Sequence, residues 1–218
     1  MINLYIFNEK SSAAVFGIGT YIRELIVALK GSNINVCVIH LRSEKPDMEM
    51  EEIDGIRYWY IPSPSTINNN YQKTEELNDR YYRNISYLLQ LYIVQKEYGE
   101  NIIFYMNYLK CKPLVDALKT TFDCKIVLVV HYLNSIMTLM GNISQLRSII
   151  SQTDELTDKI EKFAKEAFLN EQKLFQSHSI DKIICLSYHA FDLLHQDYQI
   201  DKEKMVVIYN GLTDVTVR

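Results

Sequence analysis

The sequence predicts an α/β protein with a three-layer, Rossmann-like architecture, in which helices cover both faces of a doubly wound, mainly parallel sheet. Two observations carry this prediction. Short β-branched runs alternate along the chain with longer segments of helical periodicity, which is typical of βαβ units. The runs Lys125–Val130 and Lys182–Leu186 are almost entirely apolar, as strands are when both of their faces are buried.

The first half of the chain contains a strand–helix–strand pattern followed by a long helix. In the helix predicted over Thr20–Lys30 the apolar residues fall on one face, and Gly31 is placed to end it. Asp54-Gly55 is a turn signal in front of a strand. The other elements predicted here are strands at Ile2–Phe7, Asn35–His40 and Ile56–Ile61, a surface excursion at Leu41–Asp54, and a helix over Tyr71–Tyr98 that ends at Gly99.

The second half of the chain repeats the alternation of strands and helices. The elements predicted here are strands at Asn101–Tyr105, Lys125–Val130, Lys182–Leu186 and Met205–Tyr209, helices at Pro113–Thr120 and Tyr188–Asp197, and a long helical region over Ser144–Ser177. We see no internal repeat and no interdomain linker, so residues 1–218 are expected to form one domain.

Composition excludes several classes of protein. With 218 residues and 48% hydrophobic content the chain can bury a substantial core. A net charge of -4 with scattered basic residues does not favour nucleic-acid binding. No run approaches the roughly 20 apolar residues of a membrane helix, and Met1–Phe7 is expected to be a buried strand rather than a signal peptide. The four cysteines form no C-x-x-C pair, which indicates reduced thiols and a cytoplasmic protein.

Tyrosine is unusually frequent in the long helix after the third strand. Five of the 16 tyrosines are Tyr81, Tyr82, Tyr87, Tyr92 and Tyr98. Such a helix can face the core with its phenol groups reaching the surface. It can also line a sugar site or touch a membrane interface, which would make the protein a peripheral membrane protein.

The sheet rule selects the loops in which a ligand site is expected. In doubly wound sheets, ligands bind beyond the carboxyl ends of the strands. The segments at that edge are the loops Asn8–Gly19, Asn107–Lys112 and His131–Asn142, together with Ser187 and Asn210. The His131–Asn142 loop is long and partly apolar, and it could be a mobile loop that contacts a ligand.

The loop between the first strand and the first helix is rich in glycine. In Phe16-Gly17-Ile18-Gly19-Thr20-Tyr21 the glycines allow close approach of a ligand, and the N–H groups of the helix start attract an anion such as phosphate. The alternative is a loop that only lets the helix start tightly. A nicotinamide dinucleotide is not expected, because Ile22 stands where the fingerprint needs its third glycine and no acidic residue ends the second strand.

Three further positions are candidates with a structural alternative. His131 ends a buried strand, where its imidazole can donate to a hydroxyl group of a ligand or be satisfied by the backbone. Ser187 precedes a helix and is expected to cap it. Asn210-Gly211 is a turn signal after a strand, with a role in a cleft as an additional alternative. The spacing of histidines, cysteines and carboxylates predicts no metal site.

Four segments together resemble a known family. They are the glycine loop and helix start Gly17–Leu25, the strand Val127–Val130 ending in His131, the strand Lys182–Leu186 ending in Ser187, and Val206-Val207-Ile208-Tyr209-Asn210-Gly211. In this order they resemble the N-terminal domain of retaining glycosyltransferases of the glycogen-synthase-like family, which have the GT-B fold. The closest likeness is to transferases of bacterial polysaccharide biosynthesis. Two departures are Phe16, where the family often has a glycine, and Tyr132, where it often has an aspartate.

The resemblance implies a function for the chain as the acceptor-binding half of a glycosyltransferase. The donor would be a nucleotide-diphosphate sugar, held mostly by a C-terminal domain that lies beyond this chain, and no tightly bound cofactor is implied. The acceptor would be a saccharide or a lipid-linked saccharide. By resemblance His131 would be the catalytic-site residue facing the sugar, and Gly17, Ile18, Gly19, Thr20, Tyr21, Asn107, Tyr132, Ser187 and Asn210 would bind substrate or phosphate.

This chain alone would then be nearly inactive, and the whole protein would be a hexosyltransferase in the cytoplasm or at the inner face of the membrane. The alternative from another class is a non-catalytic, flavodoxin-like module that binds a ligand or a protein.

Overall fold

The computed structural model describes residues 2–9, 17–64, 71–93, 101–152 and 156–211, with only the backbone described for 71–75. The strands are β1 (Ile2–Glu9), β2 (Ile34–Ser43), β3 (Glu49–Ile53), β4 (Ile56–Pro62), β5 (Asn101–Met106), β6 (Cys124–Val130), β7 (Lys182–Cys185) and β8 (Met205–Val207). The helices are α2 (Ile18–Leu29), α3 (Tyr71–Gln90), α4 (Lys112–Thr121), α5 (Asn134–Thr138), α6 (Ile143–Ser151), α7 (Lys159–Phe175) and α8 (Tyr188–Gln196), with a 3₁₀ turn at Lys202–Lys204.

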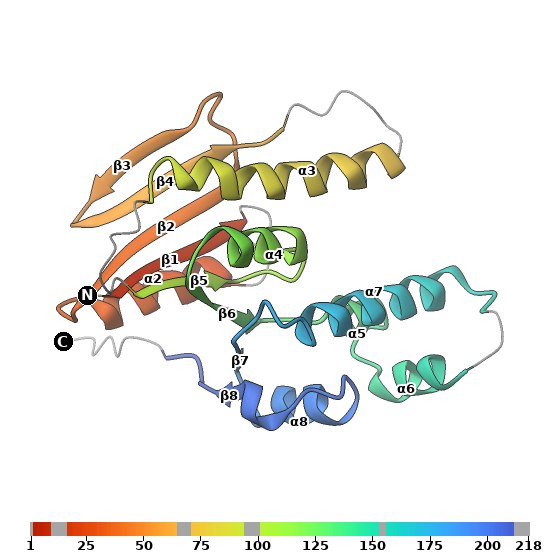
Figure 1. Ribbon diagram of the computed structural model, residues 1–218. Helices are drawn as coiled ribbons and strands as arrows, with labels where there is room; N and C mark the ends of the chain where they lie inside the picture. Colours follow the sequence, from red (N-terminus) through yellow and green to blue (C-terminus); the bar gives the residue numbers. More distant parts are fainter. Residues whose placement is uncertain (1, 10–16, 65–70, 94–100, 153–155, 212–218) are drawn as a thin grey trace, which may run out of the picture.

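The eight strands form one sheet with the order β3-β4-β2-β1-β5-β6-β7-β8 (Figure 1). All neighbouring pairs are parallel except β3 and β4. From β1 the chain first builds outward through β2 and β4, and then returns to build the other side from β5. The order of strands therefore reverses between β1 and β5, and the predicted doubly wound sheet is confirmed.

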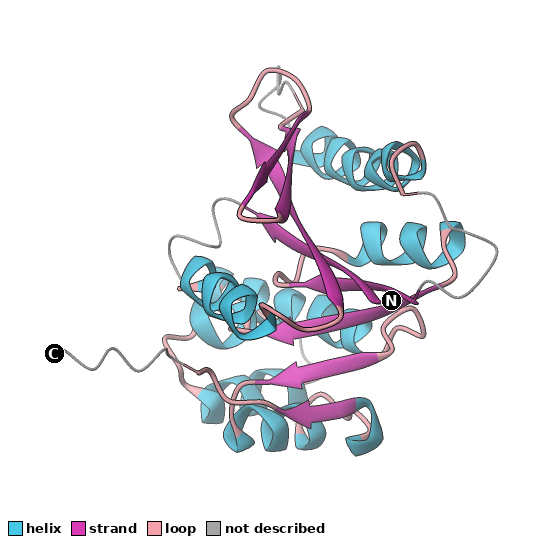
Figure 2. Ribbon diagram, turned by 90° about the vertical axis from the view of Figure 1, so that its left-hand side faces the viewer, coloured by secondary structure: helices cyan, strands magenta, loops and turns pink. Residues whose placement is uncertain are grey.

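Helices lie on both sides of the sheet (Figure 2). Alternate residues of β1 show how the two faces are used: Leu4 and Ile6 pack with α2, whereas Tyr5 and Phe7 belong to the larger core cluster that includes residues of α3, α4 and α7. A strand buried on both faces needs apolar residues at nearly every position, which is what made the strands recognisable in the sequence.

The segment Leu41–Asp54 is not the surface excursion that we predicted. β2 continues to Ser43, and Glu49–Ile53 forms the edge strand β3, which is antiparallel to β4 with Ile53 opposite Ile56. Asp54 and Gly55 have φ angles of 52° and 77°, the left-handed pair of a tight hairpin turn. All of β3 is exposed, and its glutamates make it an edge that discourages pairing with another chain. Without apolar alternation, the strand gave no signal of its own.

Two predicted helices are shorter than their periodicity indicated. α3 ends at Gln90, followed by a turn, whereas Tyr98 and Gly99 lie outside the described residues. In the second case the region Ser144–Ser177 is divided into α6 and α7. Asp158 caps α7 by accepting the N–H groups of the first turn, so a new helix starts there.

The tyrosines of the predicted long helix divide between the core and the surface, and Tyr92 lies beyond the end of α3. Tyr82 is buried, while Tyr87 is 65% and Tyr92 is 45% exposed. Tyr98 lies outside the described residues. The prediction that this helix faces the core is confirmed for Tyr82. The prediction that its tyrosines touch a membrane interface stays untested.

The predicted loop His131–Asn142 is helical over part of its length. It contains α5, whose Ser135 is fully buried, and a tight turn at Met140 and Gly141. The tertiary contacts of Ser135 stabilise this short helix, which is why the local sequence did not reveal it. Tertiary contacts therefore hold part of this segment, and the hypothesis that it is mobile stays untested.

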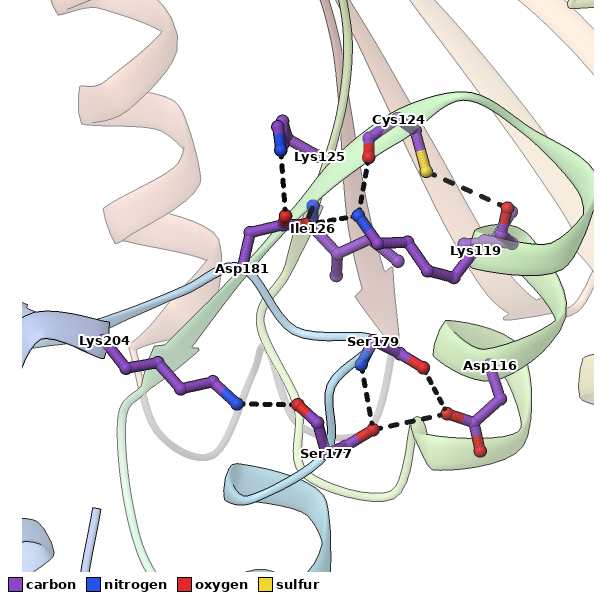
Figure 3. Close-up of polar contacts among 10 residues, drawn as sticks. Asp116, Lys119, Cys124, Lys125, Ile126, Ser177, Ser179, Asp181 and Lys204 are labelled. Atoms are coloured by element: carbon purple, nitrogen blue, oxygen red, sulfur yellow. Dashed lines mark hydrogen bonds and ion pairs between the residues drawn. The ribbon is translucent and has the colours of Figure 1, made fainter. Parts of the chain in front are cut away.

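The amino ends of β6 and β7 are joined by polar contacts around Asp181 (Figure 3). Asp181 Oδ2 accepts hydrogen bonds from Lys119 Nζ at 2.7 Å and from the Ile126 N–H at 2.8 Å, and Lys125 Nζ lies 3.2 Å from Oδ1. Burial acts to raise the pKa of Asp181, but the donors from Lys119, Ile126 and Lys125 outweigh it and hold the pKa below its usual value. At the amino ends of β6 and β7 the Asp181 carboxylate is therefore satisfied by protein donors.

Candidate functional site

Helix α2 begins at the carboxyl edge of the sheet without a side-chain cap. Gly17 is its N-cap, with φ 69° and ψ 9°, a conformation in which a side chain would be strained. The N–H of Tyr21 is bonded to Gly17 O at 3.0 Å, so the N–H groups of the preceding helical residues have no acceptor in the helix. Gly17, Gly19 and Thr20 are exposed, and the first turn has no acidic residue. This turn can therefore receive an anion.

The other two residues predicted in the glycine loop are anchored to the sheet. The side chain of Ile18 is fully buried in the core cluster with β1 and β2, so only its backbone can face a ligand. Tyr21 is half-buried, and its hydroxyl is 2.5 Å from that of Tyr105 on β5. Burial raises the pKa of Tyr21, although the bond to Tyr105 acts to lower it, so both hydroxyls stay neutral.

The structure brings three of the predicted residues together next to α2. His131 follows β6 directly, and its ring meets that of Tyr21 edge-on, with centroids 4.9 Å apart and an interplanar angle of 79°. His131 Nε2 lies 3.0 Å from Asn107 Oδ1, and Asn107 Nδ2 donates to the carbonyl of Phe7 at 3.2 Å. The ends of β1, β5 and β6 and the start of α2 therefore converge on His131.

The surroundings of His131 keep its imidazole uncharged. Burial lowers the pKa of His131 to about 4, so the ring is neutral at physiological pH and offers one hydrogen-bond donor and one acceptor. Asn107, by contrast, is only 1% exposed, and both ends of its side-chain amide are engaged by protein atoms.

The remaining predicted residues lie at the same edge but are not all joined to this group. Tyr132 is half-buried and packs against the cores on both faces of the sheet. Ser187 caps α8, since its Oγ accepts the N–H of Ala190 at 3.1 Å, which confirms the capping prediction. Asn210 is exposed beyond the end of β8.

A buried carboxylate that we did not predict holds the segment after His131. Glu171 on α7 accepts the backbone N–H of Asn134 and the hydroxyl of Ser135, at 2.5 and 2.6 Å, and the hydroxyl of Tyr198 at 3.0 Å. Burial raises the pKa of Glu171 despite these donors. The contacts fix the start of α5 only three residues beyond His131, so they also restrain where His131 lies.

A sequence signal for this carboxylate existed. Ala164, Phe168, Glu171 and Phe175 follow one another at helical spacing, and all four are buried. A glutamate on the apolar stripe of a helix is rarely buried without partners. The partners could not be named from the sequence, because they come from α5 and from the chain after α8.

A second cluster that we did not predict lies at the carboxyl ends of β1 and β2. Arg42 Nε is 2.6 Å from Glu9 Oε1, and the hydroxyl of Tyr82 donates to the same oxygen at 3.2 Å. The backbone of Arg42 has φ 54°, and its N–H donates to the Tyr81 hydroxyl at 2.9 Å. The two charges neutralise each other, so this cluster suits a neutral, hydroxyl-rich ligand better than an anion.

No metal cluster or membrane span is found in the part of the chain that the structure describes. In those residues, no three histidine, cysteine or acidic side chains are grouped to hold a metal ion. None of the described helices is both long enough and apolar enough to cross a membrane. All four cysteines are buried and unpaired.

Comparison with known families gives one match over nearly the whole chain. The model of Glycosyltransferase Family 4 matches residues 15–214. No curated protein sequence matches the chain.

Solved structures with a similar fold are glycosyltransferases of low sequence identity. Sucrose-phosphate synthase from Thermosynechococcus elongatus has a TM-score of 0.62 at 14% identity, and the match covers 97% of this chain and 49% of that one. A UDP-forming α,α-trehalose-phosphate synthase from Burkholderia vietnamiensis has a TM-score of 0.51 at 8% identity, with 97% and 48% covered. LpCGTa, solved in complex with UDP, has a TM-score of 0.55 at 11% identity, with 99% and 55% covered. The chain thus spans about half the length of these structures, and its fold is that of the N-terminal half of a GT-B enzyme.

Proposed function

The chain belongs to Glycosyltransferase Family 4, and we propose that it is the N-terminal, acceptor-binding domain of a retaining, hexosyltransferase-type enzyme. The whole enzyme moves a sugar from a nucleotide-diphosphate sugar to a saccharide or a lipid-linked saccharide. In this proposal residues 1–218 form a single domain, and the donor is held mainly by a C-terminal domain of the same protein.

One observation carries the proposal: a neutral histidine, His131, lies beside the uncapped start of α2. Both are at the carboxyl edge of the sheet, close to the point between β1 and β5 where the strand order reverses. The Tyr21 ring, which contacts His131, stands on the first turns of α2. A helix start favours the phosphates of a nucleotide sugar, and a neutral imidazole favours its hydroxyl groups. The two features together therefore suit a ligand that carries both phosphates and hydroxyl groups.

The proposed acceptor side is the Glu9–Arg42 cluster. Its ion pair is only 12% and 24% exposed at the two side chains and is internally neutral. Hydroxyl groups from Tyr81 and Tyr82 surround it. A neutral cluster with hydroxyl groups favours a saccharide acceptor over an acceptor that is recognised by its charge.

Exposed apolar residues near the end of the described chain support a second domain. Tyr188, Val206, Ile208 and Tyr209 are between 40% and 64% exposed, and the rings of Tyr188 and Tyr209 contact each other. Apolar side chains gathered on one surface are typical of a docking face. We propose that the donor domain covers this face.

The donor is proposed by analogy with the matched structures. One is described as UDP-forming and another as a complex with UDP. UDP-sugars are therefore the first donors to test. Catalysis would rest on holding the acceptor hydroxyl against the anomeric carbon and on stabilising the leaving diphosphate at the α2 start.

We also propose a cytoplasmic location, at the inner face of the membrane if the acceptor is lipid-linked. The buried, unpaired cysteines support a reducing compartment.

The test is sugar transfer by the full-length gene product and by this chain alone. Each is incubated with a panel of nucleotide sugars and saccharide acceptors, and both nucleotide release and the configuration of the new linkage are measured. We expect transfer with retention by the full-length protein and little or none by this chain. Robust transfer by the 218-residue chain would contradict the domain proposal. If the gene encodes no second α/β domain and no donor is used, the binding-module alternative replaces the enzyme.

A further inference from the structure

The hydrogen bonds around Asn107 determine which way its amide points. The carbonyl oxygen of Phe7 can only accept a hydrogen bond, so the atom of Asn107 that lies 3.2 Å from it must be Nδ2. The other end of the amide, Oδ1, therefore faces His131 Nε2 at 3.0 Å. Because Asn107 is 1% exposed, water does not compete for either end.

The orientation of Asn107 in turn determines where the proton of His131 lies. An amide oxygen accepts but cannot donate, so Nε2 must carry the hydrogen. The buried ring is neutral at physiological pH and carries only one N–H. Its second nitrogen, Nδ1, is then unprotonated, and no hydrogen bond joins it to any of the residues that the structure describes.

The ring of His131 is also held against rotation. A half-turn would replace Nε2 with a carbon opposite Asn107 Oδ1 and would break that bond. The Tyr21 ring packs edge-on against the imidazole, and Tyr21 is itself tied to Tyr105 through their hydroxyls. The direction in which Nδ1 accepts a hydrogen bond is therefore preset before any ligand arrives.

We propose that Asn107 is a positioning residue that keeps His131 in the Nε2–H tautomer, so that His131 Nδ1 accepts a hydrogen bond from a hydroxyl group of the ligand. A hydroxyl can donate to Nδ1, whereas a fully ionised phosphate oxygen cannot. The site thus separates two chemistries: anionic oxygens are received by the start of α2, and a sugar hydroxyl is received by His131. The identity of the ligand as a sugar rests on the proposed function, but the tautomer does not.

Another histidine of the same chain is an internal control. His195 Nδ1 lies 2.9 Å from the carbonyl of Ile200, which can only accept, so His195 carries its hydrogen on Nδ1. The two histidines are therefore expected in opposite tautomers when neutral. Only His131 depends on Asn107.

The experiment is ¹⁵N NMR of the intact protein labelled at its five histidines, since protonated and unprotonated ring nitrogens have well-separated shifts. The His131 signals are assigned by their loss in His131→Gln. We expect His131 protonated at Nε2 and His195 at Nδ1 at neutral pH. A wild-type His131 that carries its hydrogen on Nδ1 would overturn the proposal.

Two variants of Asn107 test its role. Asn107→Leu keeps the size of the side chain and removes both hydrogen bonds, and we expect a mixture of tautomers at His131 with His195 unchanged. Asn107→Asp keeps an acceptor opposite Nε2 but loses the donor to the Phe7 carbonyl. It should therefore be less stable than the wild type, retain the Nε2–H tautomer and shift the protonation of His131 to higher pH. A pure Nε2–H tautomer in Asn107→Leu, or no shift in Asn107→Asp, would show that Asn107 only fills space. If Asn107→Leu does not fold, the Asp variant alone decides.

The NMR result also separates this inference from the proposed function. The tautomers can be read without any substrate, so an inactive protein with the expected tautomers would contradict the enzyme proposal alone. In an active protein, Asn107→Leu should lower transfer while Asn107→Asp retains more of it, as the acceptor opposite Nε2 predicts.

Discussion

The two ends of the parallel sheet both carry polar groups at strand ends, but they use them differently. At the amino end, Asp181 is surrounded by Lys119, Lys125 and the Ile126 N–H, and its carboxylate is satisfied by protein donors. At the carboxyl end, the chain from Phe7 through Asn107 to His131 stops at a ring nitrogen with no partner among the described residues. We call the first network closed, because protein donors satisfy its carboxylate, and the second open, because one of its acceptors is left for a ligand.

The difference teaches how stability and function can be told apart in this fold. A closed network lowers the energy of the folded chain and has nothing left for a ligand. An open network fixes the orientation of one group and leaves its hydrogen-bonding capacity unused until a ligand arrives. We therefore expect substitutions at the amino end to change stability and those at the carboxyl end to change activity.

Of the substitutions that test this difference between the two ends, His131→Ala in the full-length protein is expected to have the largest effect. Loss of a positioned acceptor should lower kcat/KM for transfer by about a hundredfold or more, because the sugar hydroxyl is no longer held. Steady-state kinetics measures this effect. The matched control is His178→Ala, an exposed histidine near the amino end, which should leave transfer unchanged. Equal losses in both variants would break the comparison.

The next effect concerns Asp181→Ala at the closed end. Removing the carboxylate leaves the Ile126 N–H and the Lys125 ammonium group without this acceptor, while Lys119 keeps only the Cys124 carbonyl. The free energy of unfolding should therefore fall by about 2 kcal/mol. Urea unfolding measures this change. Lys125→Ala is the control, since its side chain is 72% exposed and the variant should lose less than about 0.5 kcal/mol. A loss of transfer in folded Asp181→Ala would contradict the assignment of this end to stability.

The two ends of the sheet should lose stability in different pH ranges. The pKa of His131 falls from an ordinary value near 6.5 to about 4 in the folded state, so the unfolded chain binds the extra proton first and stability falls as pH drops from 6.5 toward 4. The pKa of Asp181 is also lowered, so its contribution is present above the unfolded value near 4 and is lost below it. Unfolding measured between pH 7 and 3 should show both losses.

Variants assign these two windows. His131→Gln should flatten the curve between pH 6.5 and 4 by on the order of 1–3 kcal/mol, and Asp181→Asn should flatten it only below about pH 4. If His131→Gln left the curve between pH 6.5 and 4 unchanged, the inference that the buried His131 imidazole is neutral would be wrong.

The smallest effect is expected from Tyr21→Phe. The variant keeps the ring against His131 but leaves the hydroxyl of Tyr105, a buried residue, without its partner, which should cost about 1 kcal/mol of stability. Transfer should fall less than in His131→Ala, because the edge-on contact remains. A loss as large as that of His131→Ala would mean that the Tyr21 hydroxyl itself contacts the substrate.

Most strands and helices could be predicted from the sequence, because the patterns that indicate them extend over only a few residues. Apolar runs such as Lys125–Val130 identified buried strands, and Ser187 was recognised as a cap from its place before a helix. Local signals failed where contacts from distant segments decide the structure. β3 is polar and forms only by pairing with β4, and α5 is held by Glu171 from 36 residues away.

By itself the sequence determined the alternation of strands and helices, the glycine at the start of α2 and the histidine at the end of β6. These follow from side-chain periodicity and backbone conformation, which act over a few residues. Only the tertiary structure decided that Asn107 and His131, 24 residues apart, would meet, and that the Phe7 carbonyl would orient the amide between them. Hydrogen-bond direction depends on groups brought together from β1, β5 and β6, and no pattern along one strand encodes it.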